Sequence, residues 1–456
     1  MKPLPVLFAA FQVLALLACA VLPSALSGDP STGEPTTAPP CVPNAQGSGC
    51  LPVAPDSERV DLAPPSFSNP TQIDNRLHPT GVVQSAVYLG SAEGQPFRSE
   101  VALMPRTRTI TWNGQRVEVL ETQSFAHVDG RIHEVALDWY AQADDGSVWH
   151  FGEDVFHYEG GAVADTHGTW LAGRDGPAAM VMPGFPQVGD VHRSENIPGL
   201  VFAEVTVQSI AVTVDGPSGP VQGAIIVQEL RMDGSYEEKM FAPGYGEIST
   251  AGGGGLEALA VAAPTDSQTW PMPRELRAMS AGGDRIYEKV FLDDWAAAEI
   301  PLADLDSAWQ GLRAMDIPPL LLEGQIDDAL NVLREALDGR QPEQALQAAI
   351  GLGRAVLDLQ LVFRSPAEID LARFGLLARQ LGLDIAAGDA AAAIGDAASL
   401  EWTRDRFVDT LTASDAEQVE ALLEEIRSAI DAEDLGAAAD AATRLGEVVR
   451  SLIAEG

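Results

Sequence analysis

Turn dipeptides divide the chain from Gly114 to Trp170 into short runs of β-favouring residues. The turns are Asp129-Gly130, Asp145-Gly146 and Gly160-Gly161. Two-residue turns of this kind, spaced roughly 15 residues apart, are typical of hairpins in an antiparallel meander. The pattern therefore predicts several neighbouring antiparallel strands in this part of the chain.

The β pattern extends over residues 71–250, with further long strand-like runs around 202–214 and 221–230. We expect about nine or ten strands in this region, with no helix between them. A series of that length predicts a curled antiparallel sheet, a half-barrel or a barrel, which can enclose a cavity.

Helical periodicity replaces the β pattern from about residue 318 to the end of the chain. Turns near Gly339, Gly388 and Glu433 divide residues 318–456 into three helical hairpins, with a period of roughly 47 residues. We expect an acidic bundle of six helices or a short solenoid. The fold class is therefore multidomain β + α, a meander sheet or half-barrel followed by an all-α helical-hairpin bundle.

Two of the predicted helices carry a capping box at their start. The sequences Ser365-Pro-Ala-Glu and Ser414-Asp-Ala-Glu place a serine at the N-cap and a glutamate three residues later. Residues 251–317, which begin with four glycines, predict a Gly-rich linker with short helices. Such a linker would let the two domains move independently.

The first residues have the form of a secretory signal, with Lys2 followed by an apolar run. Two cleavages are open: removal of residues 1–27, or a lipoprotein signal that leaves Cys19 lipidated. In either case we expect export to the periplasm, the cell surface or the extracellular space. No later apolar run reaches the roughly 20 residues of a transmembrane helix, so we expect no membrane span in the mature chain, with a lipid anchor possible only through Cys19.

Residues 28–70 are rich in Pro, Ser, Thr and Gly and predict a disordered or extended tether. Cys41 and Cys50 lie within this segment. In an exported protein, two such cysteines are expected to form a disulfide that closes a small loop.

Hairpin loops of two residues fix the register of the strands that they join. The first two turns then place Glu121 opposite Asp138, and Asp138 opposite Glu153, on one face of the sheet. Like charges directly opposite one another destabilise a sheet. Three explanations are open: the carboxylates bind a hard cation such as Ca²⁺, one of them is protonated as in an acid–base site, or the register differs by one residue and the acids are solvated.

Aromatic side chains lie beside the acidic row in the predicted registers. The neighbouring row, expected on the same face as the acids, consists of Val119, Tyr140, Phe151 and Trp170. Acids beside aromatic walls are typical of a pocket. We take Tyr140, Trp149 and Phe151 as ligand-binding candidates, and Glu121, Asp138 and Glu153 as metal-ligand candidates.

All seven histidines lie between His78 and His192, within the predicted β domain. The registers place His127 and His133 on opposite faces and put His157 opposite Glu134. A cross-strand hydrogen bond explains the last pair better than a metal site. We therefore do not expect a zinc centre built from histidines.

Four motifs carry a resemblance to a known family. They are Asp138-Trp-Tyr-Ala-Gln142, Gly146-Ser-Val-Trp-His-Phe-Gly-Glu-Asp154, Pro186-x-Val-Gly-Asp190 and Ala242-Pro-Gly-x-Gly246. In these motifs the chain resembles a family of uncharacterised secreted bacterial β-rich proteins, over about 170 residues. The resemblance implies a β domain but no established activity. This chain departs from the family at His150, where an aromatic residue is expected, and at Gly223-Ala224, where a cysteine is common.

Charge and missing motifs exclude several classes of function. A net charge of −38 argues against nucleic acid or an anionic membrane as an electrostatic partner. The sequence contains no Gly-x-Ser-x-Gly elbow, His-Glu-x-x-His helix, phosphate-binding loop or dinucleotide fingerprint. Residues 318–456 contain no histidine, cysteine or lysine, which argues against a di-iron or histidine-ligated haem bundle.

These observations favour a non-enzymatic exported binding protein of the cell envelope. The β domain would bind a cation or small ligand at the acidic and aromatic face, and the helical domain would bind an unidentified protein. Two alternatives remain: a hydrolase that uses the paired carboxylates of the β domain, and a purely structural envelope protein.

Overall fold

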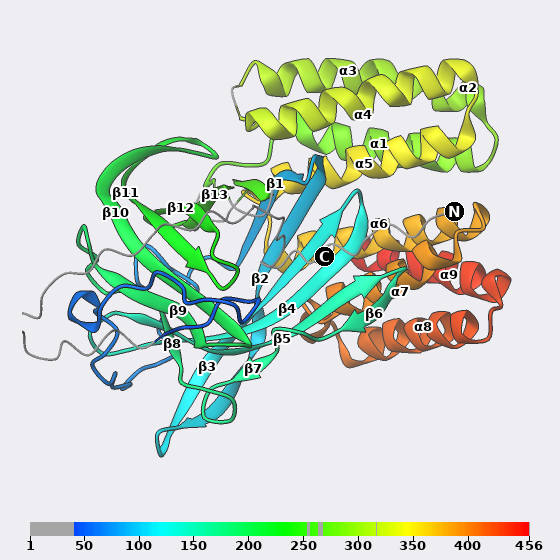
Figure 1. Ribbon diagram of the computed structural model, residues 1–456. Coiled ribbons are helices and arrows are strands. Elements are labelled where there is room, and N and C mark those ends of the chain that lie inside the picture. Colours follow the sequence, from blue (N-terminus) through cyan, green and yellow to red (C-terminus); the bar gives the residue numbers. More distant parts are fainter. Residues whose placement is uncertain (1–40, 253–255, 263–267, 316, 456) are drawn as a thin grey trace, which may run out of the picture.

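The computed structural model describes residues 41–252, 256–262, 268–315 and 317–455. The predicted signal over residues 1–27, with Cys19, lies outside the described residues, as does the first part of the predicted tether. Within the described chain, a β domain is followed by a helical region (Figure 1). This arrangement confirms the predicted fold class.

The described strands form one 14-stranded antiparallel sheet. The strands are β1 (Ser85–Ala92), β2 (Gln95–Trp112), β3 (Gln115–Val128), β4 (Arg131–Gln142), β5 (Val148–Glu159), β6 (Ala162–Asp165), β7 (Trp170–Leu171), β8 (Ala179–Met182), β9 (Val191–Ile197), β10 (Val201–Gly216), β11 (Gly219–Arg231), β12 (Tyr236–Ala242), β13 (Gly246–Gly252) and β14 (Leu256–Ala262).

The sheet curls until its two ends approach one another. Its strand order is β6-β5-β4-β3-β2-β1-β14-β13-β12-β11-β10-β9, with β7 and β8 paired to β5. Strand β9, at one end, lies against β8 and β5 near the other end. The result is the predicted half-barrel, and its concave face surrounds an interior space.

Strand β14 corrects the predicted boundary of the β domain. Residues 256–262 were expected to belong to a flexible linker, but they pair with β1 on one side and with β13 on the other. The β domain therefore extends to residue 262. The preceding glycines conceal this strand in the sequence, because glycine runs are typical of linkers.

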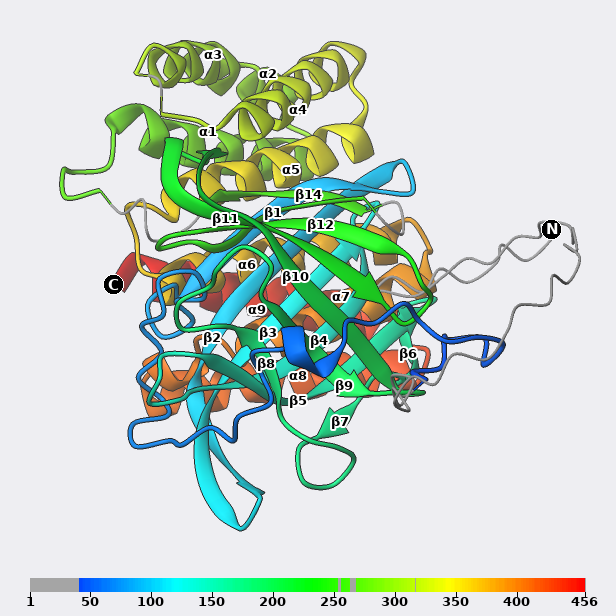
Figure 2. The same cartoon turned by 60° about the vertical axis from the view of Figure 1, so that its left-hand side comes forward.

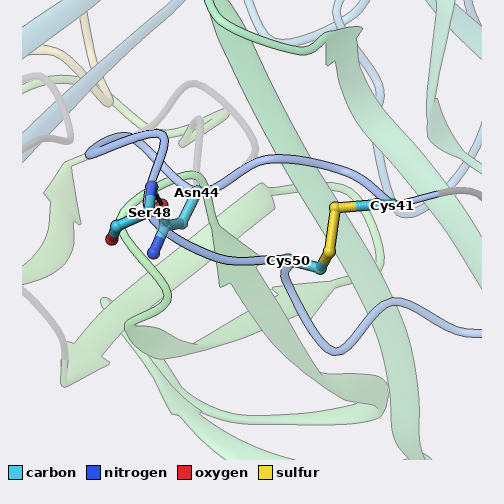
Figure 3. The surroundings of a disulfide bond; sticks show 4 residues. All are labelled: Cys41, Asn44, Ser48 and Cys50. Atoms are coloured by element: carbon cyan, nitrogen blue, oxygen red, sulfur yellow. Dashed lines mark hydrogen bonds between the residues drawn. A yellow bond between two sulfur atoms is a disulfide. The ribbon is translucent and has the colours of Figure 1, made fainter.

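The predicted tether is wrong for residues 41–70, which pack against the β domain. Val42 and Leu51 are buried beside Phe202 of β10. Cys41 and Cys50 form the expected disulfide, with a Cα–Cα distance of 5.1 Å, and the loop between them contains a hydrogen bond from the Ser48 N–H to Asn44 Oδ1 (Figure 3). Apolar anchors and the disulfide together hold this segment in place.

The described helices are α1 (Arg274–Phe291), α2 (Trp295–Ala298), α3 (Ile300–Arg313), α4 (Leu320–Gly339), α5 (Pro342–Gln360), α6 (Pro366–Ala386), α7 (Ala390–Arg404), α8 (Ala413–Asp431) and α9 (Leu435–Glu455). The three predicted turns lie between α4 and α5, α6 and α7, and α8 and α9. The helical region nevertheless begins at residue 274, because α1 to α3 occupy much of the predicted linker. No described helix is long and apolar enough to cross a bilayer.

The helices cover the convex face of the sheet (Figures 1 and 2). Side chains of β2 alternate between the two faces of the sheet. Phe97, Ser99 and Val101 line the interior space. Arg98 and Glu100, which lie between them in sequence, contact the helices. Arg98 forms two hydrogen bonds to Asp358 of α5, at 2.6 and 2.9 Å. The domains are thus joined by buried ion pairs, not by a linker that leaves them independent.

Candidate functional site

The concave face of the sheet encloses a cavity of about 450 Å³. Its wall is largely apolar, with side chains from most strands of the sheet. Representative apolar lining residues are Val101, Ala126, Ala136, Val155, Val227 and Phe241. Volume and lining are those of a small-molecule site, which typically combines an apolar wall with a few polar groups that orient the ligand.

Polar side chains gather at one end of the cavity, on β4 and β5. Asp138 and Glu153 are neighbours in the register of these strands, and Tyr140 is the neighbour of His150. The Tyr140 and His150 rings are stacked, with 4.9 Å between centroids. His150 Nε2 lies 3.4 Å from Asp138 Oδ1. We call Asp138, Tyr140, His150 and Glu153 the polar wall of the cavity.

A bulge in β5 places His150 and Glu153 on the same face although they are three residues apart. The register shifts between Asp138 and Tyr140, so that Phe151 and Gly152 together face Trp139. Gly152 has φ +132°, and a Cβ atom there would lie 2.4 Å from the carbonyl oxygen of Trp170. Glycine is therefore required at the bulge, and the bulge gives the polar wall its two residues from β5.

Glu195 of β9 adds a third acid to this end of the cavity. It approaches Glu153 across the seam where β9 meets β5, and both residues line the cavity. Burial raises the pKa of Glu153 well above its usual range, and the charges of Asp138 and Glu195 raise it further. The Trp170 indole N–H, which donates to Glu153 Oε1 at 3.2 Å, acts in the opposite direction. The protonated form of Glu153 is thus favoured in the closely spaced group of acids.

Two titratable rings of this end, those of Tyr140 and His78, are held neutral. Burial raises the pKa of Tyr140 well above its usual range, and the neighbouring Asp138 and Glu153 raise it further. Burial lowers the pKa of His78 to about 4. His78 stands against Tyr140, with 5.1 Å between ring centroids, and its Nδ1 is 2.8 Å from the Thr80 hydroxyl oxygen.

His150 has an open hydrogen-bonding atom within the cavity. The residue is only 5% exposed, and its Nε2 has no hydrogen-bond partner among the described residues. The nearby Asp138 oxygen lies within ion-pair distance but outside hydrogen-bond geometry. Buried polar atoms are rarely left without a partner, so this nitrogen is a candidate contact for a bound molecule.

A second polar group lies on β11 and β12. Lys239 Nζ is 3.2 Å from Glu229 Oε1, and Arg231 Nη2 is 3.2 Å from Glu237 Oε2. Here acids and bases compensate one another. The polar wall has no such compensation, because Asp138 and Glu153 form no ion pair with a described lysine or arginine.

The predicted acidic row is wrong at Glu121. This residue pairs with Trp139 on the convex face, where it accepts hydrogen bonds from Trp139 Nε1 at 2.9 Å and Arg106 Nε at 2.7 Å. The register shift lies between Ala126 and His127, close to the first turn. Because β4 has one extra residue there, every later pairing of β3 with β4 is shifted by one residue. Glu121 therefore lies on the opposite face of the sheet from Asp138.

Three predicted site residues therefore meet in the cavity, namely Asp138, Tyr140 and Glu153. Trp149 and Phe151 do not, because both are buried in the apolar cluster around Trp139 on the other face. Without Glu121 the expected calcium site loses one of its three ligands. In the part of the chain that the structure describes, no three His, Cys, Asp or Glu side chains are arranged to hold a metal ion.

Sequence reasoning missed His150 and Glu195. The sequence offered one signal for His150, because an aromatic residue was expected at that position. Glu195 had no local signal, since only closure of the sheet brings β9 to β5. The predicted pair of His157 and Glu134 is confirmed, with Nδ1 3.2 Å from Oε2.

No protein-family model matches the chain, and no curated protein matches it either. The geometry of the cavity must therefore carry the functional argument.

Proposed function

We propose that the β domain is an exported binding module that takes up a small, largely apolar organic molecule in its cavity. The single observation behind this proposal is an apolar cavity of about 450 Å³ with a cluster of polar side chains at one end. His150 Nε2, buried and without a hydrogen-bond partner among the described residues, supports it further. Side chains that a folded protein needs only for stability are normally packed and paired.

Filling the cavity tests this function. Ala136 lines the cavity near the middle of β4, between Ser124 and Val155 in neighbouring strands. We expect Nile red, an uncharged apolar dye, to bind the full chain with saturable fluorescence. Ala136→Phe should abolish this binding, whereas Ala162→Phe, at an exposed position of β6, should leave it unchanged.

Thermal unfolding gives an independent measure of the same binding. A ligand that binds only the folded state stabilises it by about 2.7 kcal/mol at a hundredfold excess over Kd. Saturable dye binding that survives Ala136→Phe in a folded variant would place the dye outside the cavity and contradict the proposal.

A hydrolase that uses Asp138 and Glu153 is the second candidate function. It is favoured by the position of Glu153 opposite Asp138 and by the raised pKa of Glu153, because a carboxyl that keeps its proton can act as a general acid. The test is a panel of glycoside and ester substrates, with turnover expected to disappear in Glu153→Gln. Inactivity of the native chain across the panel would count against it.

The helical domain is proposed to bind a protein partner. Its support is a set of exposed apolar side chains at the end of α1 and the start of α3, namely Phe291, Leu292 and Ile300. Replacing these three by serine should abolish capture of the partner from the exported fraction while dye binding in the cavity persists. Unchanged capture would favour the purely structural alternative for this domain.

A further inference from the structure

The charge of the cavity restricts what it can bind. Six acids line it, and the fixed cations among its described lining residues are Arg231 and Lys239. The acidic lining residues are Glu134, Asp138, Glu153, Glu195, Glu229 and Glu247. Both cations stand beside Glu229 and Glu237. Asp138 and Glu153 of the polar wall, by contrast, form no ion pair with a described lysine or arginine.

Aromatic rings surround the same end. Tyr140 lies between His78 and His150, and the Trp170 ring meets His150 edge-on with 5.1 Å between centroids. These rings make the surroundings of the acids largely apolar. Trp170 does not line the cavity and Tyr140 lies between two histidine rings, so it is the acids that favour a cationic head group.

His150 provides an observation independent of charge. Its unpartnered Nε2 lies 3.4 Å from Asp138 Oδ1, on a ring that stacks on Tyr140. In the neutral imidazole with the proton on Nδ1, Nε2 is an acceptor. A ligand N–H group would satisfy this nitrogen and Asp138 together.

The competing head groups fit less well. A carboxylate or phosphate would be repelled by the charges of Asp138 and Glu195, which also raise the pKa of Glu153. A bare metal ion lacks a suitable group of ligands within the described chain. An uncharged head group would leave the negative charge of Asp138 uncompensated in an apolar surrounding, which is costly.

We infer that the cavity selects an amphipathic organic cation, whose ammonium group binds at Asp138, His150 and Glu153 while its apolar part lies along the wall formed by Ala136, Val155 and Val227. This inference rests on the proposed binding function and names the class of its ligand.

Binding of such a cation is coupled to a proton. Glu153 faces Glu134 and Asp138 of β4, Glu195 of β9, and His150 and Trp170, and in this setting its pKa is raised. An ammonium group beside it favours the ionised carboxylate, so binding releases a proton. Affinity for the cation should therefore increase as pH rises toward the pKa of Glu153 in the unliganded protein.

The test compares three probes that share one apolar chain, namely decylamine, decanol and decanoate, by calorimetry on the full chain. We expect decylamine to bind at least tenfold more tightly than the other two. Asp138→Asn should weaken decylamine binding about tenfold and leave decanol unchanged. Glu159→Gln, at an exposed acid at the end of β5, should change neither.

The ratio of amine to alcohol affinity makes the result independent of small losses of folded protein. Equal affinities for decylamine and decanol, or an amine-to-alcohol ratio that Asp138→Asn leaves unchanged, would overturn the cation inference. If Nile red still bound, the proposed function would stand. Failure of Nile red and all three probes would overturn both. Stabilisation by Ca²⁺ alone that is lost in Asp138→Asn would show a metal site and also overturn the inference.

Discussion

At the scale of single residues, Gly152 determines which side chains of β5 reach the cavity. On its N-terminal side Phe151 packs on the convex face, and on its C-terminal side Glu153 returns to the concave face. The positive φ of Gly152 makes this reversal possible within one residue. The site therefore depends on a residue that has no side chain and does not line the cavity.

Gly152→Ala should destabilise the protein strongly. The backbone conformation alone costs about 1–3 kcal/mol for a residue with a Cβ atom, and the new methyl group would overlap the Trp170 carbonyl oxygen. Denaturant unfolding measures the loss. Gly446→Ala in α9 is the matched control, because nothing lies within 4 Å of its added Cβ and alanine favours a helix. A similar stability for both variants would refute the argument.

At the scale of elements, bulges decide which parts of the site follow from sequence. The turn at Asp129-Gly130 has the predicted pairing of Val128 with Arg131, but the shift beside His127 moves Glu121 to the other face. The predicted register of β4 and β5 is wrong at Tyr140, which pairs with His150. The one-residue bulge in β5 that follows then brings Glu153 opposite Asp138, as predicted. Turn residues predict a hairpin from the sequence, whereas no comparable sequence pattern predicts a one-residue bulge within a strand.

The sequence and the structure assign different N-cap residues to α8, and the two assignments can be tested. The sequence favours Ser414 as the N-cap, but α8 begins at Ala413 and the Thr412 side chain accepts the hydrogen bond from the Asp415 N–H. Thr412→Ala should cost about 1 kcal/mol of stability. Ser414→Ala should change stability little, since Ser414 is exposed within the first turn. The reverse order in thermal unfolding would support the sequence-based assignment.

At the scale of the whole molecule, one sheet separates the ligand cavity from the helices. Turn dipeptides between runs of β-favouring residues predicted the sheet, and helical periodicity predicted the three hairpins. Neither pattern shows which charged residues are buried between the domains. Glu100 on β2 illustrates this, because Arg373 and Arg406 from the helical region hold its pKa well below the usual range, as does Arg98 on the same strand.

The buried pair of Arg98 and Asp358 should hold the two domains together as one folding unit. Removing one partner leaves an uncompensated buried charge, which typically costs about 3–5 kcal/mol. We expect Asp358→Ala to lower stability by that order and to separate domain unfolding into two calorimetric transitions. Glu425→Ala, which breaks an exposed ion pair with Arg444, should produce no measurable change. A single transition at the native temperature in Asp358→Ala would mean that this ion pair is not needed to join the domains.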